Sequence, residues 1–299
     1  MTKAVFSLWK KPIDNGQLRY GYNSLYDLAC SYVLAIETAR KHYPNIDLVT
    51  DDAGKNLLVR ALGIEFNSVT TELNEIATLS AMHWAMPKII AMKVQTDSFL
   101  YLEGNIMLWK DLPEELKKSE VVFQNPEPSD LFDAYYLEVL KDGFMNAPAQ
   151  PEVIKGNEVS MAFNTSLCLI NNPEFSKIWA EAAIDYVLNS KNATYWENEF
   201  GKGRHHNMVF DYWFPACIAS KAGMLASINV GFYLKAYDAQ DYIYSHTHGT
   251  SRRDANVTEA IRKRIEIEYP QYMDALNDLR KSNSTDELLF VTEEAEGTK

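Results

Sequence analysis

Apolar and polar residues follow one another in blocks along the chain, and these blocks predict strands that alternate with helices. Short apolar runs at Ala4–Trp9, Ile46–Thr50 and Phe99–Leu102 have the length and content of buried strands. Later strands are expected at Met161–Phe163, Leu167–Ile170, Phe232–Ala236 and Tyr242–Ser245.

Stretches with apolar residues at helical spacing separate these runs. The first, Asn23–Tyr43, begins with Ser24 and Asp27 arranged as in a capping box, and Pro44 follows its end. The other predicted helices are Lys55–Leu62, His83–Val94, Asp130–Leu140, Pro173–Asn189, His206–Ala222 and Asp254–Tyr269. Alternating strands and helices are typical of an α/β fold with a mostly parallel central sheet and helices on both faces, and we predict this fold class.

Nothing in the sequence divides the chain into several domains. It has no internal repeat, no low-complexity linker and no clear break in composition. We therefore expect one domain over residues 1–280. The polar and acidic segment 281–299 is expected to be a mobile tail.

Composition and charge exclude some classes of function. The 299 residues are 46% hydrophobic and 23% charged, which is ordinary for a globular protein. The net charge of -12 argues against general nucleic-acid binding, which needs excess Lys and Arg, but is compatible with a local basic pocket. The three cysteines lie far apart, as in a reduced cytoplasmic protein. We expect no signal peptide and no transmembrane segment, since no stretch approaches about 20 apolar residues.

The first candidate for chemistry is Glu103-Gly104-Asn105, which lies between two apolar runs. It follows the predicted strand Phe99–Leu102, and ligands of open α/β sheets bind outside the carboxyl ends of the strands. Gly104 permits an unusual backbone angle, so that Glu103 and Asn105 can present two oxygen atoms to a ligand. The alternative is a polar hairpin turn between two strands.

The second candidate is the segment from His246 to Arg252, which reads H-x-x-G-x-x-R. Arg252 offers a planar fork of donors that suits phosphate, and Gly249 lets backbone approach a ligand closely. The alternative is a surface loop before a helix that Asp254 caps.

Two more sites are suggested by residue type and place. Thr50 and Asp51 follow a predicted strand, where they either hold a base or ribose or begin a helix. Asp211 is an acid among apolar and aromatic residues of a predicted helix. It needs a partner or a raised pKa, unless it faces solvent.

The order of these segments resembles the GT-A glycosyltransferases. Phe99–Pro113 resembles their strand–DxD–strand segment, and KAVFSLW, LVTDDAGK and FNTSLCLINNPEF follow the order of that fold over about Lys3 to Arg280. The match is nearest to a poorly characterised group of bacterial GT-A-like proteins. The resemblance implies a GT-A-type fold and a cytoplasmic glycosyltransferase that moves a sugar from a nucleotide-sugar donor, expected to be a UDP-sugar, to an unidentified acceptor.

The resemblance also implies roles for single residues. In GT-A enzymes the acidic pair holds Mn²⁺ or Mg²⁺, which bridges the donor's two phosphates. The metal ligands implied here are Glu103, Asn105 and His246, the last because the second motif resembles the HxxGxxK motif of retaining GT-A enzymes. The residues implied to bind the donor nucleotide are Thr50, Asp51, Glu103, Gly104, Asn105, Gly249 and Arg252. Asn164 is similar to the asparagine of an NTG turn that contacts the donor sugar, and Asp211 is implied to orient the donor sugar or the acceptor. Asn164 has an alternative as an Asx turn between strands. A hexosyltransferase with retention of configuration is mildly favoured.

The chain departs from the GT-A pattern at the acidic pair. Glu103 is one methylene longer than the usual Asp, and Asn105 is uncharged where the last acid of the motif binds the metal directly. Metal binding is therefore expected to be weaker, altered in geometry or absent. Two other hypotheses stay open: a catalytically degenerate GT-A-fold binding module, and a nucleotidyltransferase, for which the expected Gly-rich phosphate loop is missing after the first strand.

Overall fold

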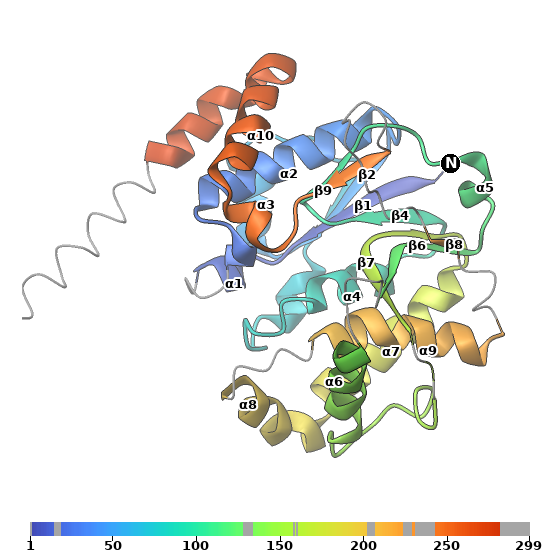
Figure 1. Ribbon diagram of the computed structural model, residues 1–299. Coiled ribbons are helices and arrows are strands. Elements are labelled where there is room, and N and C mark those ends of the chain that lie inside the picture. Colours follow the sequence, from blue (N-terminus) through green and yellow to red (C-terminus); the bar gives the residue numbers. More distant parts are fainter. Residues whose placement is uncertain are drawn as a thin grey trace, which may run out of the picture.

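A computed structural model gives the fold of the chain (Figure 1). It describes residues 2–14, 19–127, 134–157, 159, 161–201, 207–223, 229–230 and 243–281. The strands are β1 (Lys3–Leu8), β2 (Ile46–Thr50), β3 (Ser68–Thr70), β4 (Phe99–Leu102), β5 (Ile106–Leu108), β6 (Val121–Glu127), β7 (Ala162–Ile170), β8 (Asn229–Val230) and β9 (Tyr244–His246). The α-helices are α1 (Lys11–Asp14), α2 (Leu25–Arg40), α3 (Asp52–Lys55), α4 (Met86–Lys93), α5 (Glu114–Lys117), α6 (Ala134–Met145), α7 (Pro173–Leu188), α8 (Ala193–Gly201), α9 (Phe214–Lys221) and α10 (Ala255–Glu268).

A mixed, mostly parallel sheet forms the centre of the fold. Its seven strands follow the order β3-β2-β1-β4-β7-β6-β8, and within the described part only β7 runs against its neighbours. The strands β1 and β2 pair from Ala4 with Ile46 to Leu8 with Thr50, and β1 pairs with β4 in the same direction. The carboxyl ends of β1, β2 and β4 therefore meet at one edge of the sheet. This arrangement confirms the predicted fold class.

Helices cover both faces of this sheet, and each face has its own hydrophobic core. The helices α2 and α10 lie on one face, whereas α4, α6, α7, α8 and α9 lie on the other (Figure 1). Alternate β1 residues belong to the two cores: Val5 lies in the core that also holds residues of α4 and α7, and Phe6 lies in the core that holds residues of α2. Strand residues buried on both sides explain the continuous apolar runs of the sequence. No helix of the described residues is long and apolar enough to span a membrane.

Several local signals act as predicted. The helix α2 begins after Ser24, whose hydroxyl accepts a hydrogen bond from the Asp27 N–H, and α10 begins after Asp254, which accepts from the Asn256 N–H. The predicted helix Lys55–Leu62 is instead one α-helical turn, α3, followed by the π-helix η2 (Asn56–Ala61).

Two predictions about strands are wrong. The residues Asn164-Thr165-Ser166 do not separate two strands, because β7 runs through them without a break. The local hydrogen bond of the Asx alternative is present, since Asn164 Oδ1 accepts from the Ser166 N–H at 3.1 Å. The pairing of β7 with β6 shifts there: Phe123 pairs with Cys168, whereas Asn125 pairs with Asn164, so β7 bulges between these pairs. The segment Glu103–Asn105 is not a hairpin either, since β4 pairs with β1 and β7, and β5 pairs with β9 in a second, two-stranded sheet.

Some predicted elements lie outside the described residues. These are the strand Phe232–Ala236, the first residues of the predicted helices at Asp130 and His206, the first residue of the strand at Tyr242, and the tail from 282 onward. The division into one domain and a tail stays a prediction.

Candidate functional site

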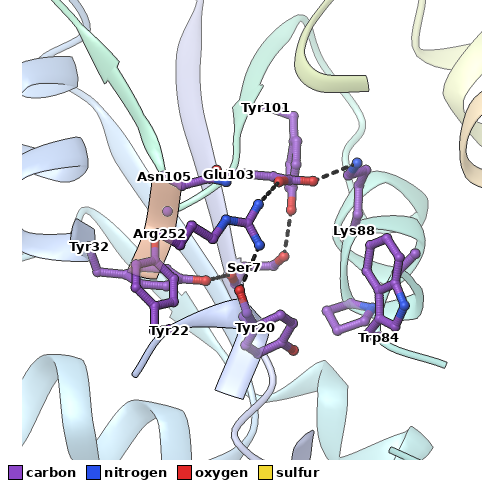
Figure 2. Close-up of a pocket in the computed structure, with 13 residues that line it drawn as sticks. Ser7, Tyr20, Tyr22, Tyr32, Trp84, Lys88, Tyr101, Glu103, Asn105 and Arg252 are labelled. Atoms are coloured by element: carbon purple, nitrogen blue, oxygen red, sulfur yellow. Dashed lines mark hydrogen bonds and ion pairs between the residues drawn. The ribbon is translucent and has the colours of Figure 1, made fainter. Parts of the chain in front are cut away.

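A pocket opens at the carboxyl ends of β1 and β4 (Figure 2). The chain order in the sheet reverses between these two strands, and such a switch point is where open α/β sheets bind ligands. The pocket is lined by Ser7, Tyr20, Tyr22, Tyr32, Trp84, Ala85, Pro87, Lys88, Tyr101, Glu103, Gly104, Asn105 and Arg252. Its cavity volume of about 70 Å³ is well below the roughly 300–1,000 Å³ of sites for drug-sized ligands. It therefore encloses part of a larger ligand, such as the phosphate groups of a nucleotide, rather than a whole nucleotide sugar.

The turn Glu103-Gly104-Asn105 carries the chain from the large sheet to the small one. The Ile106 N–H donates to the Glu103 carbonyl at 3.0 Å, and the Ser31 hydroxyl donates to the Gly104 carbonyl at 2.7 Å. Gly104 is not among the described residues with positive φ. A Cβ atom at this position would instead lie 2.3–2.5 Å from ring atoms of Tyr32. The glycine is needed for the close approach of this ring, not for the unusual backbone angle that we expected.

Lys88 of α4 stands at the centre of a buried group of polar side chains. Its ammonium nitrogen lies 2.9 Å from Glu103 Oε1, 2.9 Å from Thr165 Oγ1, and 3.0 and 3.1 Å from the two oxygens of Asp211. These partners come from the end of β4, from β7 and from the π-helix η5 (Val209–Trp213). An ammonium group has three N–H donors, so the three residues use them all. We call Lys88, Glu103, Thr165 and Asp211 the Lys88 cluster.

The charges of the Lys88 cluster stabilise one another. Burial would lower the pKa of Lys88, but Asp211 and Glu103 raise it well above its ordinary value, so the ammonium stays charged. Loss of contact with water would raise the pKa of Glu103, but Lys88 and Arg252 hold it at about 2. Burial raises the pKa of Asp211, which is 0% exposed, and Lys88 opposes this rise. Asp211 thus has the partner that a buried acid needs, and it does not face solvent.

Arg252 lies on the opposite side of the pocket from Lys88 (Figure 2). Its Nε–H donates to the Thr247 carbonyl at 3.0 Å and its Nη1 group donates to the Tyr20 carbonyl at 2.6 Å. Its Nη2 atom is 4.0 Å from Glu103 Oε2, which is an ion pair but is too long for a hydrogen bond. The guanidinium is therefore anchored by two carbonyls and still presents N–H groups to the pocket.

His246 connects the small sheet to the turn of Glu103–Asn105. Its Nε2 atom lies 3.2 Å from Asn105 Nδ2, and its Nδ1 atom lies 3.0 Å from Gln124 Nε2. Burial lowers the pKa of His246 to about 3, so the ring is neutral and has one acceptor nitrogen. The Nδ2 group of Asn105 also donates to the Thr247 carbonyl at 2.9 Å, which fixes the orientation of this amide. Nε2 is then the acceptor and Nδ1 carries the hydrogen. The Gln124 oxygen has no partner among the residues that the structure describes, and it accepts from Nδ1–H when the Gln124 amide is turned by half a rotation.

The three residues expected to hold a metal ion do not fit a divalent cation. The carboxylate of Glu103 faces two cations, and the Nε2 lone pair of His246 receives the Asn105 amide. Of the three, the buried Asn105 Oδ1 atom alone has no hydrogen-bond partner within the described ranges. Mg²⁺ and Mn²⁺ prefer several oxygen ligands, carboxylates above all. Among the described residues, no group of three or more His, Cys, Asp or Glu side chains could hold a metal ion.

The other predicted site residues lie outside the pocket lining. Thr50 is fully buried and donates to the Leu8 carbonyl at 2.6 Å, so it offers no group to a nucleotide, and we correct that expectation. Asp51 caps α3 by accepting from the Gly54 N–H at 2.7 Å and also accepts from the Lys10 N–H, which is the helix-start alternative. Asn164 donates to Glu127 at 3.2 Å. Gly249 has positive φ, 53°, as a close-approach glycine needs, with open space around it.

Lys88, the central residue of the site, was not among the residues predicted to form it. Lys88 is a lone charge within the apolar part of α4, whose other charged residue, Lys93, stands at the helix end. Asp211 is likewise the one charged residue of the π-helix η5. Two lone, opposite charges on two apolar helices signal a buried ion pair, and this signal was available in the sequence. The tyrosines of the pocket were also missed as site residues.

Fold and site together define an α/β protein with a charged pocket at the switch point of its sheet. Residues 2–279 match the model of a family of unknown function, DUF6734, and the chain belongs to that family. No curated protein matches the chain.

Solved structures similar to the chain show weak overall likeness. Mouse xyloside xylosyltransferase 1 in its apo form has 10% identity and a TM-score of 0.38, over 77% of this chain and 84% of that one. The glycosyltransferase GlyE of Streptococcus pneumoniae TIGR4 has 11% identity and a TM-score of 0.42, over 94% and 65%. The inositol-1-phosphate CTP transferase from T. maritima has 13% identity and a TM-score of 0.40, over 89% and 97%. All three TM-scores lie below 0.5, so these similarities do not identify an activity.

Proposed function

We propose that this protein is a GT-A-type glycosyltransferase that moves a sugar from a nucleotide-sugar donor, a UDP-sugar, to an acceptor. The observation that carries the proposal is the meeting of the two motifs that resemble GT-A enzymes. Asn105 and His246 are 141 positions apart in the chain, yet their side chains lie 3.2 Å apart, and Arg252 forms an ion pair with Glu103 at 4.0 Å. In GT-A enzymes these motifs act together on the diphosphate of the donor.

The site has the groups that a glycosyl transfer needs. In this reaction the bond between the anomeric carbon and the diphosphate oxygen breaks and its electron pair leaves with the nucleoside diphosphate. A hydroxyl of the acceptor bonds to that carbon and gives up its proton to the departing diphosphate or to water. Arg252 presents N–H groups where the departing diphosphate would gain charge, and donors fixed in place stabilise such charge well. Asp211 lies behind Lys88 and does not line the pocket, so its proposed part is to position Lys88.

Other parts of the proposal rest on the sequence resemblance. These are the contact of Asn164 with the donor sugar, the approach of the Gly249 backbone to the phosphates, hexosyl transfer with retention of configuration, and a cytoplasmic location. NMR of the first product formed distinguishes a retained from an inverted anomeric carbon.

Calorimetric titration with UDP and with GDP, followed by a screen of sugar nucleotides for hydrolysis, tests the proposed function. We expect UDP to bind and one UDP-sugar to be hydrolysed slowly without acceptor. Binding of a nucleotide without turnover of any sugar nucleotide would favour the degenerate binding module. Release of pyrophosphate from a nucleoside triphosphate would favour a nucleotidyltransferase.

A further inference from the structure

The carboxylate expected to bind a metal ion is held between two cationic side chains of the protein. Glu103 Oε1 lies 2.9 Å from the Lys88 ammonium, and Glu103 Oε2 lies 4.0 Å from Arg252 Nη2 (Figure 2). Lys88 cannot leave without depriving the buried Asp211 of its counter-ion, since all the Lys88 donors are used and Asp211 is 0% exposed. A divalent cation on Glu103 would therefore sit beside two positive charges that the fold keeps in place.

The other two expected metal ligands, Asn105 and His246, are hydrogen-bonded to each other. The Asn105 amide donates to His246 Nε2 and to the Thr247 carbonyl, so turning its oxygen toward a metal beside the ring breaks both hydrogen bonds. In its present orientation Asn105 contributes one neutral oxygen, Oδ1. A single neutral oxygen is a poor substitute for the charged oxygen ligands that Mg²⁺ and Mn²⁺ prefer.

Arg252 is the cation of the pocket that can meet a diphosphate. The charged residues that line the pocket are Lys88, Arg252 and Glu103, and the Lys88 ammonium is balanced by Glu103 and by the buried Asp211 behind it, so the N–H groups of Arg252 are the ones left for phosphate oxygens. Arg252 is held by two backbone carbonyls, and its Nη2 group makes no hydrogen bond within the described residues. A guanidinium fixed in this way is already ordered, so binding phosphate oxygens costs little additional side-chain entropy.

We propose that this pocket binds the diphosphate of its nucleotide ligand without a divalent cation, and that Arg252 takes the place of the metal. The proposal rests on the proposed function, because it assigns the means by which the same site holds its donor. It also gives Glu103 a new part: it aligns the two cations and is not a metal ligand.

Calorimetric titration with UDP, once with EDTA and once with Mn²⁺, tests this proposal on the full chain. We expect the same affinity in both solutions. The free Mn²⁺ signal in electron paramagnetic resonance should not fall when the protein is added, with or without UDP. Arg252→Met should weaken UDP binding by about 10- to 100-fold, the range for hydrogen bonds to charged groups. Arg253→Met is the matched control, since Arg253 is exposed on the same turn and binds the Gly21 carbonyl, and it should bind UDP like the unchanged protein.

Glu103→Gln separates the two mechanisms by the sign of its effect. Without a metal, the substitution removes a negative charge next to the phosphates, so UDP binding stays equal or becomes tighter. With a metal, it removes the one charged ligand, so UDP binding weakens and Mn²⁺ no longer helps. UDP binding that requires Mn²⁺ would overturn the metal-free proposal and leave the proposed function in place. Absence of nucleotide binding in every solution, by a chain that circular dichroism shows to be folded, would overturn both.

Discussion

Replacing Lys88 tests how much the ion pairs of the Lys88 cluster contribute to the stability of the folded chain. Methionine has a similar length and no charge, so Lys88→Met keeps most of the packing in α4 and removes the cation. Asp211, which is 0% exposed, then keeps one partner in the described part of the chain, the Thr165 hydroxyl at 2.7 Å. Removing one partner of a buried ion pair costs about 3–5 kcal/mol in stability, and we expect Lys88→Met to lose this much free energy of unfolding.

The second half of the test is a double-mutant cycle. Asp211→Asn keeps the shape of the side chain and removes its charge, so the double variant with Lys88→Met buries no unpaired charge at this place. We therefore expect the double variant to be more stable than Lys88→Met alone, with a coupling of about 1–3 kcal/mol. Urea unfolding followed by circular dichroism and by tryptophan fluorescence measures each free energy.

The pH dependence of Lys88→Met gives an independent check. Without Lys88, the Thr165 hydrogen bond remains to oppose the effect of burial, which is the larger cause and raises the pKa of Asp211 above its value in the unfolded chain. The folded variant then binds a proton that the unfolded chain does not, so its deficit relative to the unchanged protein should shrink as the pH falls toward 4. A loss of less than about 1 kcal/mol, additive effects in the double variant, or a deficit that grows on acidification would refute this account of the cluster.

Three further predictions follow from single side chains. Burial lowers the pKa of His83 to about 4. Between about pH 6.5 and pH 4 the unfolded chain therefore takes up a proton that the folded chain does not. The free energy of unfolding should fall on acidification through this window by up to about 3 kcal/mol. His83→Leu should flatten that part of the stability curve, and an unchanged slope would contradict the assignment. Gly104→Ala places a methyl group against the Tyr32 ring and should cost about 1–3 kcal/mol, and a smaller cost in a Tyr32→Leu background would show that this contact is the cause. The thiols of Cys30, Cys168 and Cys217 are buried, and burial raises the pKa of each, that of Cys30 to about 12. Ellman's reagent at pH 8 should therefore label the folded chain only slowly and the urea-unfolded chain completely. Rapid labelling of the native protein would contradict the buried placement of the thiols.

The sequence predicts well those elements whose signals are local. The strands Ile46–Thr50 and Phe99–Leu102 have the predicted bounds, because a short apolar run buried on both faces needs no other information. The caps at Ser24 and Asp254 are as predicted for the same reason. The strand Val121–Glu127 was missed because it ends in polar residues and Pro126, although Val121–Phe123 is an apolar run.

The site depends on pairings that sequence spacing does not record. The prediction of a break between two strands at Asn164 failed because β6 pairs with β7 before and after the polar stretch, and the bulge takes up the residues between these pairs. The neighbourhood of Lys88 and Asp211 is set by packing between elements 123 positions apart. Residue type alone predicted that Asp211 needs a partner, but only the fold shows which one.

The Lys88 cluster also constrains the routes by which this pocket can change in evolution. Substitutions of Lys88 or Asp211 alone leave a charge without its counter-ion, so each carries a stability penalty until the other position changes as well. Glu103 differs, because its second oxygen lies on the pocket side, near Arg252, and Asn105 belongs to no ion pair in the described residues. We therefore expect the pocket to diversify among natural variants at positions 103 and 105, where ligand preference can shift step by step, while positions 88 and 211 change together or not at all.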